Sequence, residues 1–154
     1  MTLEALFKGR MVDISGMMAR LRDAAEAERL PFGERKMTYN SRLAQELSKW
    51  AEGKGKIEAF NHAVFQAYFA DGCNIGDVDE LIEVVKAADF DPEEAQKVLK
   101  ERPFKHAVDV DWERSRRMGI RAVPTFVMND QILVGAQPEA ALDEFIRSEK
   151  GGLS

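Results

Sequence analysis

Cysteine and histidine are scarce in this sequence, and their scarcity restricts the chemistry that the chain can perform. The 154 residues contain one cysteine and two histidines. A single cysteine cannot form an internal disulfide, which agrees with a reducing compartment, and no Cys/His spacing typical of a zinc site occurs. No apolar run approaches the length of a membrane span, and the start of the chain lacks the apolar core of a signal peptide. We therefore expect a cytoplasmic protein with no metal, no cofactor and no membrane partner.

An excess of positive charge is absent as well. The chain has 22 Lys and Arg against 27 Asp and Glu, which gives a net charge of -5. A nucleic-acid surface needs a basic face, so this balance argues against nucleic-acid binding. Hydrophobic residues make up 45% and charged residues 32% of the chain, which is ordinary for a globular protein able to bury a core. We predict a single domain over residues 1–154.

Helical signals dominate residues 1–118. Apolar residues recur at helical spacing, and Asp13, Asn40, Asp77 and Asp91 occupy positions typical of helix N-caps. Gly119 is a natural C-terminal stop for the last helix of this part. Strand signals appear only after it, so residues 119–150 are predicted to form a β-hairpin followed by a C-terminal helix.

A proline enters the first predicted strand, and the motif around it carries a family resemblance. Pro124 has no N–H for a strand ladder, so it belongs at a strand start, an edge or a bulge. The run Val-Pro-Thr-Phe-Val at 123–127 and the segment 134–138 resemble the C-terminal end of DsbA-family thiol oxidoreductases of the FrnE-type branch. Segments 37–44, 65–69 and 74–77 are similar to the helical insertion of that branch. The match covers residues 1–148.

The resemblance implies an α/β thioredoxin-like fold that is mostly helical, with a large helical insertion and a C-terminal β-β-α piece. In that family a preceding β-α-β unit carries Cys-x-x-Cys, and these 154 residues do not contain it. We therefore expect an incomplete thioredoxin fold. The resemblance also implies a cis bond between Val123 and Pro124, and it makes these two residues the predicted substrate-binding positions for peptide or protein thiols. No catalytic residue is predicted.

For the one thiol and the two imidazoles, a functional role competes with an inert structural role. Cys73 lies in a turn-like stretch with Asp71 and Asp77 near it in sequence, and negative neighbours raise a thiol pKa. We interpret Cys73 as an incidental loop residue. His62 and His106 fall on predicted helices without a metal-ligand or nucleophile pattern, so a structural role is favoured. The carboxylates lie mainly at helix caps and i,i+4 positions, where they support helices.

The predicted hairpin leaves an unpaired strand edge. A two-stranded sheet is marginal in water, and an exposed apolar edge invites another chain. We therefore predict a homodimer joined along Phe126, Val127, Met128 and Asn129.

Three hypotheses about function remain open. The first is a DsbA/FrnE-like thiol-disulfide oxidoreductase family member that is catalytically incomplete and inactive alone. The second is a homodimeric protein-interaction module that uses the hairpin edge and the helical surface. The third is a start codon chosen too late, which removed an upstream Cys-x-x-Cys segment.

Overall fold

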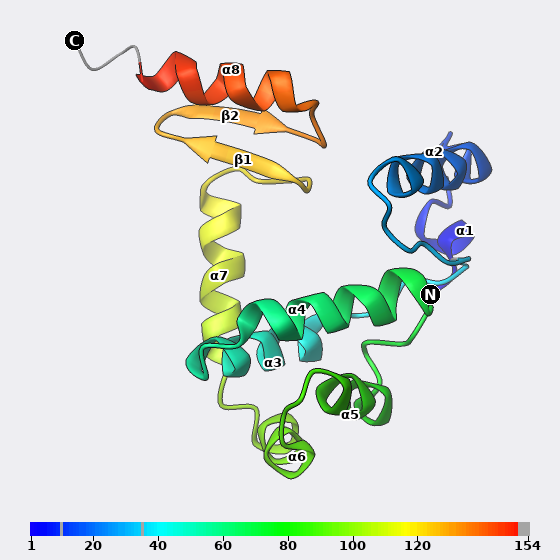
Figure 1. Cartoon of the computed structure of the whole chain (residues 1–154), viewed down its shortest axis with the longest axis vertical. Coiled ribbons are helices and arrows are strands. Elements are labelled where there is room, and N and C mark those ends of the chain that lie inside the picture. Colours follow the sequence, from blue (N-terminus) through cyan, green and yellow to red (C-terminus); the bar gives the residue numbers. More distant parts are fainter. Residues whose placement is uncertain (10, 35, 151–154) are drawn as a thin grey trace. The chain divides into compact units, whose positions relative to one another are not determined.

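The chain forms two compact units, Met1–Val108 and Asp109–Ser154, in a computed structural model that describes residues 1–9, 11–34 and 36–150 (Figure 1). The division falls inside helix α7 (Lys105–Arg117), whereas the sequence pattern divides the helical part from the hairpin after residue 118. Within the described ranges, no helix is both long and apolar enough to cross a membrane.

The first unit opens with two helices that bury little surface. Helix α1 (Leu3–Leu6) is capped by Thr2, which also forms an antiparallel bridge with Met37. Helix α2 (Ile14–Ala27) begins where Asp13 Oδ1 accepts the Gly16 N–H at 2.9 Å, so the predicted cap is confirmed. No residue of α2 is fully buried, and its apolar side is at most half-buried.

The hydrophobic core lies among the next five helical elements, which are drawn in cyan to light green in Figure 1: α3 (Arg42–Gly53), α4 (Ile57–Phe65), the π-helix η1 (Gln66–Ala70), α5 (Val78–Ala87) and α6 (Pro92–Glu101). Helix α3 contacts α4 and α6, and α5 contacts the same two helices. The buried apolar residues of this core are Ala44, Leu47, Trp50, Ala51, Phe60, Val64, Ala67, Ile75, Leu81, Ile82, Val84, Val85, Phe90, Ala95, Val98 and Leu99.

Local side-chain chemistry sets most helix starts in this unit. The carboxylates of Asp77 and Asp91 accept backbone N–H groups in the first turns of α5 and α6, as predicted. The predicted cap at Asn40 is displaced by one residue. Ser41 is the N-cap of α3, and Asn40 Oδ1 accepts the Arg42 N–H at 2.9 Å.

A buried carboxylate ties α3 to the end of α6. Glu46 is 1% exposed, and its oxygens accept from Arg42 Nε at 2.9 Å and from Arg102 Nη2 at 2.7 Å. Burial alone raises the pKa of Glu46, but hydrogen bonds from Arg102 and Arg42, together with their charges, outweigh it and hold the pKa below its usual value. Arg102 ends α6 in the left-handed conformation at φ 52°.

The second unit contains the rest of α7, strands β1 (Thr125–Met128) and β2 (Gln131–Val134), and helix α8 (Glu139–Lys150). The strands pair antiparallel through a two-residue turn in which Asn129 has a φ of 52°. Asparagine tolerates that left-handed conformation, which suits tight hairpin turns. Both strands are four residues long.

Candidate functional site

The segment before β1 is fixed by hydrogen bonds on both sides of Pro124. The Val123–Pro124 peptide bond is cis. Thr125 Oγ1 donates to the Ala122 carbonyl at 2.6 Å, and the Gly135 N–H donates to the Pro124 carbonyl at 2.8 Å. Val123 between them is 89% exposed. The segment is thus held in place, and the apolar side chain of Val123 projects from the surface.

The strand register decides which backbone groups face away from β2. Pro124 is bonded to Gly135, and hydrogen-bonded and non-hydrogen-bonded positions alternate along an antiparallel pair. Phe126 therefore directs its backbone groups toward β2, whereas Thr125 and Val127 direct theirs away from it. Among the described residues, the Val123 backbone also forms no hydrogen bond. We call the backbone groups of Val123, Thr125 and Val127 the outer edge of β1.

The predicted dimer edge is only partly suited to pairing with another strand. Of its four residues, Phe126 and Met128 turn their backbone groups inward to β2, while Val127 lies on the outer edge. The register also places Val127 and its partner Ile132 on one face of the hairpin, and both side chains are exposed. Asn129 follows β1 in the turn. An apolar face therefore adjoins the outer edge.

Cys73 lies in the first unit, in the turn after η1. Its N–H donates to the Ala67 carbonyl at 2.9 Å, and the side chain is half-buried. Burial, followed by the charges of Glu80 and Asp71, raises the pKa of the Cys73 thiol above its usual value. The environment thus disfavours the thiolate, which is the nucleophilic form.

Both histidines are exposed on helices, His62 on α4 and His106 on α7. In the part of the chain that the structure describes, no group of three or more His, Cys, Asp or Glu side chains could hold a metal ion. His62 instead contributes to the rim of an apolar pocket.

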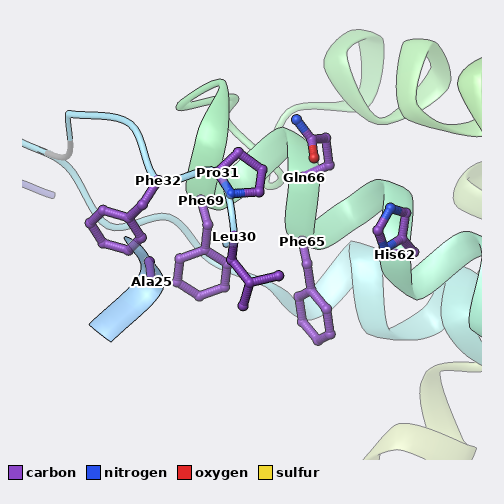
Figure 2. Close-up of a pocket in the computed structure, with 8 residues that line it drawn as sticks. All are labelled: Ala25, Leu30, Pro31, Phe32, His62, Phe65, Gln66 and Phe69. Atoms are coloured by element: carbon purple, nitrogen blue, oxygen red, sulfur yellow. The ribbon is translucent and has the colours of Figure 1, made fainter. Parts of the chain in front are cut away.

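This pocket lies where the chain after α2 meets α4 and η1, and it has a volume of about 330 Å³ (Figure 2). Leu30 and Phe65 are each 60% exposed although both line it. The lining contains no carboxylate, lysine or arginine, so the pocket suits an uncharged apolar group, and its volume lies near the lower end of the range for ligand sites, about 300–1,000 Å³. Its lining residues are Ala25, Leu30, Pro31, Phe32, His62, Phe65, Gln66 and Phe69.

A π-helix positions one wall of the pocket, and the sequence pattern does not predict it. The Asp71 N–H donates to the Gln66 carbonyl at 3.2 Å, a five-residue step that turns Phe69 toward Phe32. These two rings stack with their centroids 6.2 Å apart, and the Gly33 N–H donates to the Phe69 carbonyl at 2.8 Å. No sequence signal distinguishes it from an ordinary helix, because Phe65, Tyr68 and Phe69 have the i, i+3, i+4 spacing of one face of a regular α-helix.

Comparison with known proteins identifies the family. The DSBA-like thioredoxin domain matches residues 5–147. A protein of Bacillus subtilis strain 168, described as uncharacterized protein YwbO, is 30% identical over 112 residues, which cover 70% of this chain and 54% of that protein. The chain thus spans about half of the length of this relative. The crystal structure of a probable DsbA oxidoreductase from Streptomyces coelicolor superposes with a TM-score of 0.86 at 24% identity, covering 99% of this chain and 67% of the other.

The chain belongs to the family of DSBA-like thioredoxin domains. The predicted fold class is confirmed: a mostly helical, thioredoxin-like α/β fold in which a C-terminal β-β-α piece follows a large helical part. The 154 residues contain one cysteine, so no Cys-x-x-Cys motif occurs within them.

Proposed function

We propose that this chain supplies the peptide-holding strand of a DsbA-like thiol-disulfide exchange site, and that the 154 residues alone do not exchange disulfides. The observation that supports this most is the outer edge of β1 beside the exposed Val123. An extended peptide can add to such an edge through backbone hydrogen bonds. Val123 and Pro124 are then the substrate-binding residues, and a peptide or protein thiol is the substrate.

The chemistry of disulfide exchange supports the second half of the proposal. A thiolate attacks one sulfur of a disulfide, forms a mixed disulfide and releases the other sulfur as a thiolate; a second thiol then resolves the mixed disulfide. This sequence offers Cys73 alone, and its pKa is raised by burial and by Glu80 and Asp71. The reactive sulfur would therefore come from a residue outside these 154.

Insulin reduction by dithiothreitol tests the absence of independent turnover. The native chain and Cys73→Ser are compared with buffer alone, and thioredoxin serves as the positive control. We expect both forms of the chain to match buffer. Activity in the native chain that disappears in Cys73→Ser would contradict the proposal and establish a one-cysteine mechanism.

A homodimeric interaction module is the second candidate, and the apolar surface next to the outer edge favours it. Val127, Ile132 and Val134 are exposed on one face of the hairpin. Exposed apolar patches of this kind mark contact surfaces. The apolar pocket on the first unit, with exposed Leu30 and Phe65 at its mouth, offers a further place for a partner's side chain.

Sedimentation equilibrium separates the two candidates. A dimer joined at the hairpin would dissociate in Val127→Lys, because lysine on an edge strand opposes pairing. Val110→Lys, which charges an exposed valine of helix α7, is the matched control and should leave the dimer intact. A monomer at all concentrations would exclude the module. We expect the protein in the cytoplasm, where a lone cysteine stays reduced.

A further inference from the structure

Positive charge collects immediately before the strand that carries the outer edge. Residues 114–129 contain four arginines and no aspartate or glutamate, although the whole chain has a net charge of -5. The four side chains, Arg114, Arg116, Arg117 and Arg121, are all exposed. This segment is therefore positively charged, whereas the protein as a whole is negatively charged.

Nearby acids neutralise only part of this charge. Glu113 is shared by two of the arginines: its Oε2 lies 2.9 Å from Arg116 Nη2, and its Oε1 lies 4.0 Å from Arg117 Nε. In the described part of the chain, Arg114 and Arg121 form no ion pair. At least two guanidinium groups thus remain available to a ligand.

Helix stability accounts for three of these arginines but not for Arg121. Cations in the last turn of a helix interact favourably with its dipole, and the first three arginines occupy the last turn of α7. The helix is then closed by the Ile120 N–H, which donates to the Ser115 carbonyl at 3.0 Å, and by Gly119 with a φ of 72°. Arg121 lies beyond the end of α7, so its charge does not stabilise that helix end.

Arg121 is close to the outer edge by chain geometry. It precedes Val123 by two residues, so their Cα atoms are at most about 7 Å apart. That separation is within the Debye length of about 8 Å at physiological ionic strength. Ala122, the residue between Arg121 and Val123, has its carbonyl held by the hydrogen bond from Thr125 Oγ1 at 2.6 Å.

We propose that the extended peptide bound at the outer edge of β1 is acidic, and that Arg121 determines this specificity by binding a carboxylate near the residue that pairs with Val123. The inference rests on the proposed function, since it names the substrate class of the same edge. A guanidinium binds a carboxylate through two parallel hydrogen bonds. Because the group is exposed, its effect is strongest at low salt.

Three synthetic peptides test the proposal on the full chain. They share a central Val-Thr-Val sequence and differ only in their flanking residues, which are glutamate, glutamine or lysine. Affinity is measured by titration at low and high salt, while the amide signals of Val123, Thr125 and Val127 are followed by NMR. We expect the glutamate peptide to bind about tenfold more tightly than the glutamine peptide at low salt, with the difference falling at high salt.

Variants assign the preference to Arg121. Arg121→Gln should lose most of the preference for the glutamate peptide, and Arg121→Lys should retain part of it because the charge remains. Arg147→Gln removes an equal charge from an exposed side chain of α8 and should leave the preference for the glutamate peptide unchanged.

The outcomes separate the inference from the function on which it rests. Equal affinities for all three peptides, with shifts at the outer-edge amides, would overturn the acidic preference and leave strand pairing intact. No amide shift with any peptide would overturn the proposed function itself. Tight binding of the glutamate peptide without outer-edge shifts would mean that the arginines bind acids elsewhere, and this too overturns the inference.

Discussion

Glu46 and Arg102 are 56 residues apart in the sequence, yet Arg102 Nη2 donates to Glu46 Oε1 at 2.7 Å and Arg102 Nε donates to Glu46 Oε2 at 3.1 Å. This two-point contact joins the middle of α3 to the residue that ends α6. Arg42, one turn before Glu46 on α3, adds a third hydrogen bond at 2.9 Å. A carboxylate that is almost fully buried is therefore paired on both of its oxygens.

Removing this carboxylate should destabilise the first unit. Glu46→Ala removes the buried carboxylate that accepts hydrogen bonds from Arg42 and Arg102, and breaking a buried ion pair costs about 3 kcal/mol of unfolding free energy. Urea unfolding followed by circular dichroism measures the loss. Glu52→Ala is the control on the same helix, because Glu52 is exposed and its ion pair with Lys49 should contribute less than about 0.5 kcal/mol. Equal losses of unfolding free energy in Glu46→Ala and Glu52→Ala would show that the buried ion pair stabilises the protein no more than the exposed one.

The same carboxylate makes stability depend on pH in a defined direction. The folded-state pKa of Glu46 lies below its usual value, and the pKa of an unfolded glutamate is about 4.3. Its contribution is therefore fully present above the unfolded pKa and is lost as pH falls through the folded pKa. The stability gap between the native chain and Glu46→Gln should narrow between pH 7 and pH 3 in urea titrations. A gap that widens on acidification would contradict this assignment.

Local sequence signals predicted much of the fold. The caps at Asp13, Asp77 and Asp91 and the stop at Gly119 depend on backbone chemistry within a few residues, and the structure contains all four. The start of α3 is displaced by one residue: Ser41 is the N-cap by position, but its side chain makes no capping hydrogen bond, and Asn40 Oδ1 accepts the Arg42 N–H.

Features that depend on tertiary contacts were not predicted. The spacing of Arg42 and Glu46 indicates a surface pair on a helix, and nothing in the sequence shows that Arg102 approaches from another helix to bury it. The outer edge of β1 follows from the strand register, which the sequence alone does not fix. Val123 and Pro124 were proposed through family resemblance, and their binding role stays a prediction.

Cys73 should react slowly with alkylating agents. Because burial, Glu80 and Asp71 raise its pKa, it has less thiolate at neutral pH than an ordinary thiol. Iodoacetamide should modify it more slowly than N-acetylcysteine at pH 7.5, with a rate that climbs steeply as pH rises.

A pair of variants tests the electrostatic part of this explanation. Glu80→Gln removes one of the charges that raise the thiol pKa and should accelerate alkylation severalfold. Asp79→Asn removes the neighbouring charge, which is no cause of the shift, and should leave the rate nearly unchanged. Fast alkylation at neutral pH, at a rate that neither substitution changes, would mean that Cys73 is an activated thiol.

Gly33 should be intolerant of a side chain. A methyl group at this position would overlap the Ala70 carbonyl oxygen, and the Gly33 N–H is bonded to Phe69. Gly33→Ala should lose roughly 1–3 kcal/mol of unfolding free energy through this overlap. Gly53→Ala is the matched control, since nothing lies near its added methyl and alanine favours the helix by up to about 1 kcal/mol. Chemical denaturation of both variants should give changes in unfolding free energy of opposite sign. A Gly33→Ala variant as stable as the native chain would contradict the packing described for this loop.

The π-helix at Gln66–Ala70 has a consequence for how related sequences are aligned. One residue of an α-helix corresponds to a rotation of about 100°, so the extra residue in this turn sets the direction of every side chain that follows until the helix ends. A relative with one residue fewer between Phe65 and Asp71 could keep both flanking segments in place by replacing the wide turn with an ordinary one. A single-residue gap at this point in an alignment would then indicate a change from a π-helix to an α-helix. The pocket wall that Phe69 forms would be lost, although the helices of the core keep their lengths.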